Sequence, residues 1–170
     1  FPTRRSSDLS GFVGSETVTT TGAAGALSSK NVGSYNTTVN YTLADGTNGG
    51  LASNYTLADS TGVSAAITTK ALSIGAPTIA SKTYDGTTAA GTLTLGTLSG
   101  FVGSETVTAT GAAGALASKD VGSYNTTVGY TLANGANGGL ASNYTLADSA
   151  GVSVAITAKA LSIGAPTIAS

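Results

Sequence analysis

The sequence predicts an all-β protein made of tandem antiparallel β-sandwich units of immunoglobulin-like (Ig-like) size. Three observations lead to this fold class: an internal repeat of 89 residues, an alternation of apolar and polar residues with a period of two, and glycine-containing turns between the alternating runs. A β-solenoid or another small all-β fold is the alternative. Solenoid coils repeat about every 20 to 30 residues, and no self-similarity at so short a period is visible beyond a short echo of NYTLAD at Asn40 and Asn54.

The repeat is nearly exact over most of the chain. The segment GFVGSETVT begins at Gly11 and again at Gly100, and residues 9–81 align without a gap to residues 98–170 with 64 identities in 73 positions. Such near-identity indicates a tandem array of which this chain is a window. We expect the following organisation: a truncated first unit at 9–77 that lacks its N-terminal strands, a complete unit at 78–166, and the start of a third unit at 167–170.

Strand positions inside the unit follow from the alternation. In YNTTVGYTL, one face carries the larger residues and the other carries Asn, Thr and Gly, which is typical of a half-buried strand. The dipeptides Asp85-Gly86 and Asn137-Gly138 supply turns that tolerate a positive φ. About seven short strands per unit give a sandwich. The inward face of the clearest strand consists of Tyr124, Thr126, Val128, Tyr130 and Leu132.

Composition excludes several functional classes. The net charge is −1 and charged residues make up 9% of the chain, so there is no basic surface for nucleic acid. No segment has the roughly 18 consecutive apolar residues of a membrane helix, and we expect no membrane insertion. The chain has no cysteine, which excludes disulfides and thiolate metal sites.

Four sequence stations, in order, carry a family resemblance. They are SKTYDGTTAAGTLTL from Ser81, SKDVGSYNTTV from Ser118, SNYTLAD from Ser142 and AITAKALSI from Ala155. Together they resemble the YDG-type repeat of large bacterial surface adhesins, many of them similar to filamentous haemagglutinin and exported by two-partner secretion. The family-motif residues, expected to be structural, are Lys82, Tyr84, Asp85, Gly86, Thr87, Val121, Gly122, Asn143, Tyr144, Thr145 and Leu146.

This resemblance implies a stalk or spacer repeat of an extracellular protein on the bacterial surface, most naturally the outer surface of a Gram-negative cell. The partners it implies are neighbouring repeat units of the same chain, with host glycan or matrix protein bound through other parts of the parent. The alternative is that the units themselves bind host glycan or matrix protein. The resemblance implies no catalytic, metal or cofactor site.

The residues independently favour a protein that is not an enzyme. Histidine and cysteine, the commonest general base and the thiol nucleophile, are both absent. Asp85 is expected to form a turn with Gly86, its carboxylate accepting a backbone hydrogen bond two residues on, rather than to bind a cation. Four tyrosines are expected to pack in the core rather than to form a sugar-binding platform, with Tyr124 and Tyr130 as the core tyrosines and Tyr84 and Tyr144 beside them.

An intramolecular isopeptide bond is a further alternative. Lys82 or Lys119, together with Asn143 and Glu105, supplies the residue types for one, although residue types without geometry are weak evidence.

Residues 1–8 differ from the rest of the chain. Opposite residues 90–97, they agree at one position in eight, against 64 in 73 afterwards. FPTRRSSD, followed by leucine, resembles the translation of a short-read sequencing adapter end. We expect residues 1–8 to be a disordered assembly artefact and the chain to be a metagenomic fragment.

Overall fold

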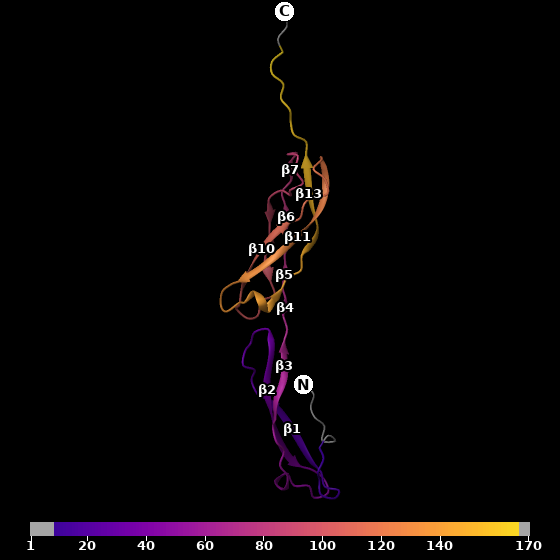
Figure 1. Ribbon diagram of the computed structural model, residues 1–170, viewed down its shortest axis with the longest axis vertical. Coiled ribbons are helices and arrows are strands. Elements are labelled where there is room, and N and C mark those ends of the chain that lie inside the picture. Colours follow the sequence, from indigo (N-terminus) through magenta and orange to yellow (C-terminus); the bar gives the residue numbers. More distant parts are fainter. Residues whose placement is uncertain (1–8, 167–170) are drawn as a thin grey trace, which may run out of the picture. The chain divides into compact units, whose positions relative to one another are not determined.

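A computed structural model of the chain describes residues 9–166 and divides them into two compact units, 9–68 and 69–166 (Figure 1). The predictions for residues 1–8 and 167–170 lie outside the described residues. The division falls ahead of the boundary expected at 77/78, because residues 70–74 pair with strands of the second unit. The second unit has the more complete fold.

The second unit contains a four-stranded sheet in the order β10-β11-β13-β7. Its long strands are antiparallel, whereas the short β7 pairs in parallel with the end of β13. The register between β11 and β13 shifts between Thr126 and Val128, which marks a β-bulge. The strands are β7 (Lys82–Thr83), β10 (Val107–Ala113), β11 (Gly122–Asn134) and β13 (Ser149–Thr157).

Three two-stranded pairs accompany this sheet. One pair, β4 with β12, is parallel, and the other two, β5 with β9 and β6 with β8, are antiparallel. A 3-10 turn, η3 (Ala141–Asn143), precedes β12. The bounds are β4 (Lys70–Ala71), β5 (Ser73–Ile74), β6 (Thr78–Ile79), β8 (Leu93–Thr94), β9 (Leu98–Ser99) and β12 (Tyr144–Thr145).

The core of this unit has two apolar clusters. The larger joins Val128, Val154 and Ile156 of the sheet to Ile79 of β6 and to Leu116, with Leu93, Leu95 and three tyrosines packed around them. The smaller joins Leu72, Val107 and Tyr144. Because sheet residues pack against residues of the short pairs, the unit is a two-layer, sandwich-like structure.

The first unit repeats only the sheet. It has the order β1-β2-β3, with the same register as β10-β11-β13 and the same bulge, here between Thr37 and Val39. The elements are β1 (Val18–Ala24), β2 (Gly33–Asp45), the 3-10 turn η2 (Ala52–Asn54) and β3 (Ser60–Ile67). Residues 9–68 correspond to residues 98–157, so the first unit has no described counterpart of the strands β4 to β8.

Burial in the two units shows what these strands contribute. Val128 has no exposed surface, whereas its counterpart Val39, on an equivalent strand, is only partly buried. Ile67 and Leu27 are likewise only partly buried, while their counterparts Ile156 and Leu116 belong to the buried cluster. The segment that precedes residue 98 therefore covers the apolar face of the sheet.

The predicted fold class is confirmed: residues 9–166 contain strands and short 3-10 turns and no α-helix. The inward face expected for 124–132 is also correct, since Thr126 and Val128 are buried and their neighbours Asn125 and Thr127 are exposed. The expected strand count is too low. From β4 to β13 the second unit has more strands than the seven predicted, because several are only two residues long.

The two units provide matched sites for one prediction. We expect Val128→Ala to destabilise the second unit by roughly 2 kcal/mol, because it removes buried methyl groups from a closed core. The same change at Val39 should cost less than half as much in the first unit. Urea unfolding followed by NMR signals from each unit measures both. Equal costs at the two sites would show that residues 69–97 do not close the core.

Candidate functional site

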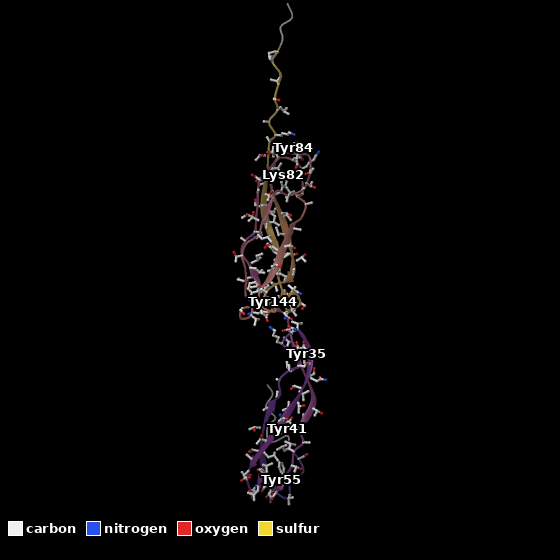
Figure 2. All side chains as sticks on the ribbon, turned by 90° about the vertical axis from the view of Figure 1, so that its left-hand side faces the viewer. Tyr35, Tyr41, Tyr55, Lys82, Tyr84 and Tyr144 are labelled. Carbon is white, nitrogen blue, oxygen red and sulfur yellow. The ribbon has the colours of Figure 1, made fainter. Side chains whose placement is uncertain are left out.

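The family-motif residues fall into two groups at opposite ends of the second unit. Figure 2 shows Lys82 and Tyr84 at one end and Tyr144 at the other. Tyr84 packs against the larger apolar cluster, and Tyr144 belongs to the smaller one. These residues therefore do not converge on one shared site.

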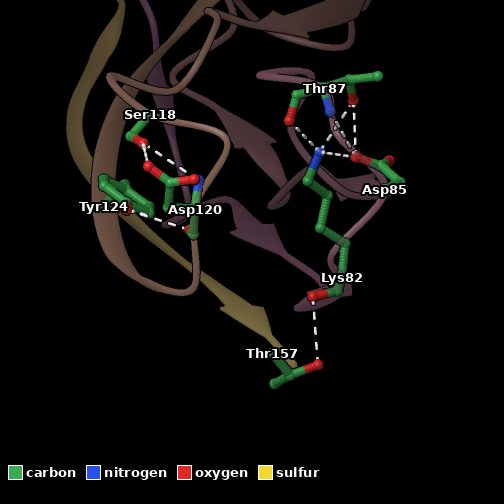
Figure 3. Close-up of polar contacts among 7 residues, drawn as sticks. All are labelled: Lys82, Asp85, Thr87, Ser118, Asp120, Tyr124 and Thr157. Carbon is green, nitrogen blue, oxygen red and sulfur yellow. Dashed lines mark hydrogen bonds and ion pairs between the residues drawn. The ribbon is translucent and has the colours of Figure 1, made fainter. Parts of the chain in front are cut away.

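The first group is a hydrogen-bonded cluster made by Lys82, Asp85 and Thr87, which we call the lysine latch. The Lys82 ammonium donates to Asp85 Oδ1 at 2.9 Å, to the Thr87 carbonyl oxygen at 2.8 Å and to Thr87 Oγ1 at 3.0 Å (Figure 3). Its side chain is only 11% exposed, whereas the Asp85 side chain is 51% exposed. All three ammonium donors thus have acceptors within one short loop.

Local sequence explains how this loop closes. Asp85 Oδ1 accepts hydrogen bonds from the Thr87 amide and the Thr87 hydroxyl, each at 2.9 Å, which is the turn that the sequence predicts. Gly86 has a φ of +80°, a backbone conformation that residues other than glycine rarely adopt. Hydrogen bonds from Lys82 and Thr87 lower the pKa of Asp85 to about 2 from its usual 3.8.

The latch also lies where β7 joins the sheet. The Tyr84 amide donates to the Thr157 carbonyl oxygen at 2.8 Å, and the Thr157 hydroxyl donates to the Lys82 carbonyl oxygen at 3.3 Å. The Leu116 amide donates to the Thr88 carbonyl oxygen at 2.8 Å. These bonds tie the loop to the C-terminal end of β13 and to the loop before β11, so the YDGT sequence has a structural role here.

The loop before β11 contains a second local hydrogen-bond group. Ser118 Oγ donates to Asp120 Oδ2 and accepts from the Asp120 amide, while the Tyr124 hydroxyl donates to the Asp120 carbonyl oxygen at 3.1 Å (Figure 3). Val121 in this loop is exposed, and Gly122 is the first residue of β11. These contacts fix how the chain enters the strand.

The second motif group surrounds Tyr144. Its ring is 4% exposed and meets the Phe101 ring edge to face, with centroids 6.2 Å apart. Its hydroxyl donates to Glu105 Oε2 at 2.8 Å and accepts from the Val102 amide at 3.2 Å. Asn143 closes the preceding 3-10 turn, Thr145 completes β12, and Leu146 packs against the cluster. This group closes the end of the unit around a buried ring.

The tyrosines do not form an exposed aromatic platform. Tyr84, Tyr124 and Tyr130 are partly buried and pack against the larger cluster, and Tyr144 is buried in the smaller one. The Tyr130 hydroxyl is also hydrogen-bonded to Ser149 Oγ at 2.8 Å. Each ring therefore has a packing role within the unit.

The residue types for an isopeptide bond are not brought together around Lys82. Its ammonium belongs to the latch, at the opposite end of the unit from Tyr144, to which Glu105 is bonded (Figure 2). Within residues 9–166 no group of three acidic side chains is arranged to hold a metal ion. No helix in the same residues is long and apolar enough to span a membrane.

Sequence reasoning missed two of these contacts. The lysine of the latch could have been anticipated, because Lys82 lies three residues before Asp85 and five before Thr87. The bond between Tyr144 and Glu105 joins residues 39 apart, and no local pattern indicates it. It recurs between Tyr55 and Glu16 in the first unit, where the bond to Glu16 raises the pKa of Tyr55.

Comparison with protein families gives a match to the YDG domain over residues 3–62 and 68–151. The second matched segment begins next to the division of the structure at 68/69. Comparison with curated proteins gives no match, and neither does comparison with solved structures.

The latch makes a titration prediction. Because the folded pKa of Asp85 is about 2 and its usual value is 3.8, its contribution to stability is present above about pH 4 and is lost as the pH falls through 2. Carboxyl-carbon NMR should give a midpoint near 2. Asp85→Asn should lower the melting temperature at pH 7 and have no effect below pH 2. A midpoint near 4 would show that Lys82 and Thr87 do not hold the carboxylate in solution.

Proposed function

Because the chain belongs to the YDG domain family, we propose that it is a structural stalk segment of a large bacterial surface adhesin or filamentous exoprotein. In this role the units space a distant binding region from the cell and carry tension along the chain. The proposed location is outside the cell, on the outer surface of a Gram-negative bacterium. The unit is proposed to act mechanically, without a catalytic step or a cofactor.

One observation carries this proposal: the chain enters and leaves the second unit at opposite ends. β4 pairs with β12 at the end that contains Tyr144, and β13 ends beside β7 at the end that contains the latch (Figure 1). Each such unit therefore advances the chain by its own length. A tandem array with an 89-residue period uses the same connection repeatedly.

The pairing of the end strands suits a unit under tension. β4 runs parallel to β12, and β13 runs beside β11 and β7. A pull along the chain loads these hydrogen bonds in shear, so several must break together, whereas peeling a hairpin breaks them one at a time. The latch adds bonds at the place where β7 holds the end of β13.

Direct ligand binding by the units remains the alternative, and the described residues give it less support. A sugar-binding surface needs exposed aromatic rings, and the tyrosines of the second unit are turned into its core. The net charge of −1 also gives the chain no basic surface for nucleic acid. Saturable binding of one complete unit on a glycan array, lost in Tyr variants that keep their fold, would favour the alternative.

Single-molecule stretching tests the mechanical role. A tandem array of residues 69–157 should unfold in equal steps of about 25 to 30 nm, the length of 89 extended residues less that of the folded unit. Asp85→Asn should lower the unfolding force without changing the step. Irregular steps, or unfolding without measurable force, would contradict a tension-bearing unit.

The surface location needs a separate readout. Antibody labelling and protease digestion of intact cells that express the parent protein should reach the repeat. A repeat found only after lysis would overturn the adhesin assignment and leave the mechanical test unaffected.

A further inference from the structure

In the second unit β10 is an edge strand. The sheet order β10-β11-β13-β7 gives it β11 as its one neighbour, and within residues 9–166 no other strand pairs with it. β10 lies in the interior of the unit, after the segment 69–97 that covers the sheet and before β11. Its open edge is therefore a property of the covered unit.

The register shows which backbone groups of β10 point toward the open edge. The Gly114 amide donates to the Thr127 carbonyl oxygen at 2.8 Å, and β10 pairs with β11 in an unbroken register. Because alternate residues of an antiparallel strand bond to the same neighbour, every second residue back from Gly114 bonds to β11. The residues between them turn their N–H and C=O groups away from β11, and among residues 9–166 these groups have no hydrogen-bond partner on that side. They are Val107, Ala109, Gly111 and Ala113.

The strand lacks the features that usually protect an open edge. Its sequence, VTATGAA, contains no charged residue and no proline, and its pairing with β11 has no bulge. Natural proteins use lysine, proline and bulges to prevent an edge strand from pairing with another chain. The edge of β10 is therefore suited to receive a further strand.

Apolar side chains beside this edge are incompletely covered. Leu93 and Leu95 of the covering layer pack over Gly111, where a Cβ would lie 2.7 Å from Leu95 Cδ2 and 3.2 Å from Leu93 Cδ2. Both leucines pack against the larger apolar cluster, as does Ala113, and all three are only partly buried. A strand added beside β10 would extend the sheet next to these side chains and remove more of their surface from water.

From these observations we propose that two copies of this chain associate through β10, the two strands pairing antiparallel about a two-fold axis at Thr110. In this register Ala109 of one copy lies opposite Gly111 of the other. Val107 likewise lies opposite Ala113, so the outward backbone groups of both strands find partners. This inference rests on strand pairing alone and does not depend on the proposed surface role.

The sequence of β10 makes a second copy the fitting occupant. About the two-fold axis Thr110 meets itself, and Thr108 meets Ala112, all of them on the exposed outer face of the sheet. The residues that face the covering layer in one copy meet those that face it in the other. No charge meets a charge, and a cross-strand pair of threonines stabilises an antiparallel sheet. The partner strand must offer small uncharged residues in this order, and β10 itself does.

The symmetry of this contact determines its product. The same surface is used by both copies, so the interface is isologous and closes as a dimer. The contact is small, and we expect a Kd of roughly 0.1 to 1 mM.

Cysteine oxidation tests the contact, which is practical because the chain has no cysteine. Thr110→Cys should give a disulfide-linked dimer, because Cα atoms of a directly opposed, non-hydrogen-bonded pair lie about 4.5 Å apart, a separation that a disulfide spans. Thr131→Cys is the matched control, since Thr131 is exposed and lies opposite Thr110 on the neighbouring strand of the same chain. Its two copies would lie three strand spacings apart, about 14 Å, and should give little dimer.

A second variant tests the role of the backbone. Ala109→Pro removes an N–H that points away from β11, so the sheet of the unit should persist, as NMR signals of the β11 amides would show. In the Thr110→Cys chain this change should abolish the disulfide-linked dimer. A dimer that forms equally well with the proline in place would contradict pairing along this edge.

A mixture of two cysteine variants tests the register without proline. Thr108→Cys chains and Ala112→Cys chains should cross-link with each other, and each should give little dimer by itself. A mixture that cross-links no better than either variant alone, or equal yields from Thr110→Cys and Thr131→Cys, would overturn the proposal.

Discussion

A sheet with one apolar face needs a second layer, and this requirement governs the whole unit. In residues 69–166 the cover comes from short strand pairs, which bury Val128, Val154 and Ile156 of the sheet. Each short pair has few hydrogen bonds, so its stability depends on what its side chains bury. Residues 9–68 have the same sheet, the same register and the same bulge without the described cover, and their corresponding side chains are less buried.

The hydrogen bonds made by the motif residues all fix loops at the ends of the second unit. The lysine latch fixes the loop after β7, the Ser118–Asp120 group fixes the entry to β11, and the Tyr144 hydroxyl closes the opposite end of the unit. All three hold the ends of the unit, where the chain enters and leaves. The two apolar clusters of the second unit contain only a few buried valine, leucine, isoleucine and tyrosine side chains, so well-bonded ends compensate for a small core.

Several of these features could be predicted from the sequence. The alternation at 124–132 places Val128 inward correctly, and Asp85-Gly86 forms the expected turn with Thr87. The alternation changes phase between Ile67 and Leu72, which indicates a bulge or a linker, and only pairing with β12 and β9 assigns Leu72 and Ile74 to the second unit. Strands of two residues give no periodic signal. The hydrogen bond from Tyr144 to Glu105 joins residues far apart in the chain, so no local sequence pattern indicates it.

Amide hydrogen exchange tests the central claim, that residues 69–97 complete the fold of a unit. Peptides from β2 and β11 can be distinguished because Asn40 stands where the second copy has Gly129. Amides of β11 should exchange at least about tenfold more slowly than the matching amides of β2. Equal protection of the two strands would contradict the account, because the sheet would then be stable without its second layer.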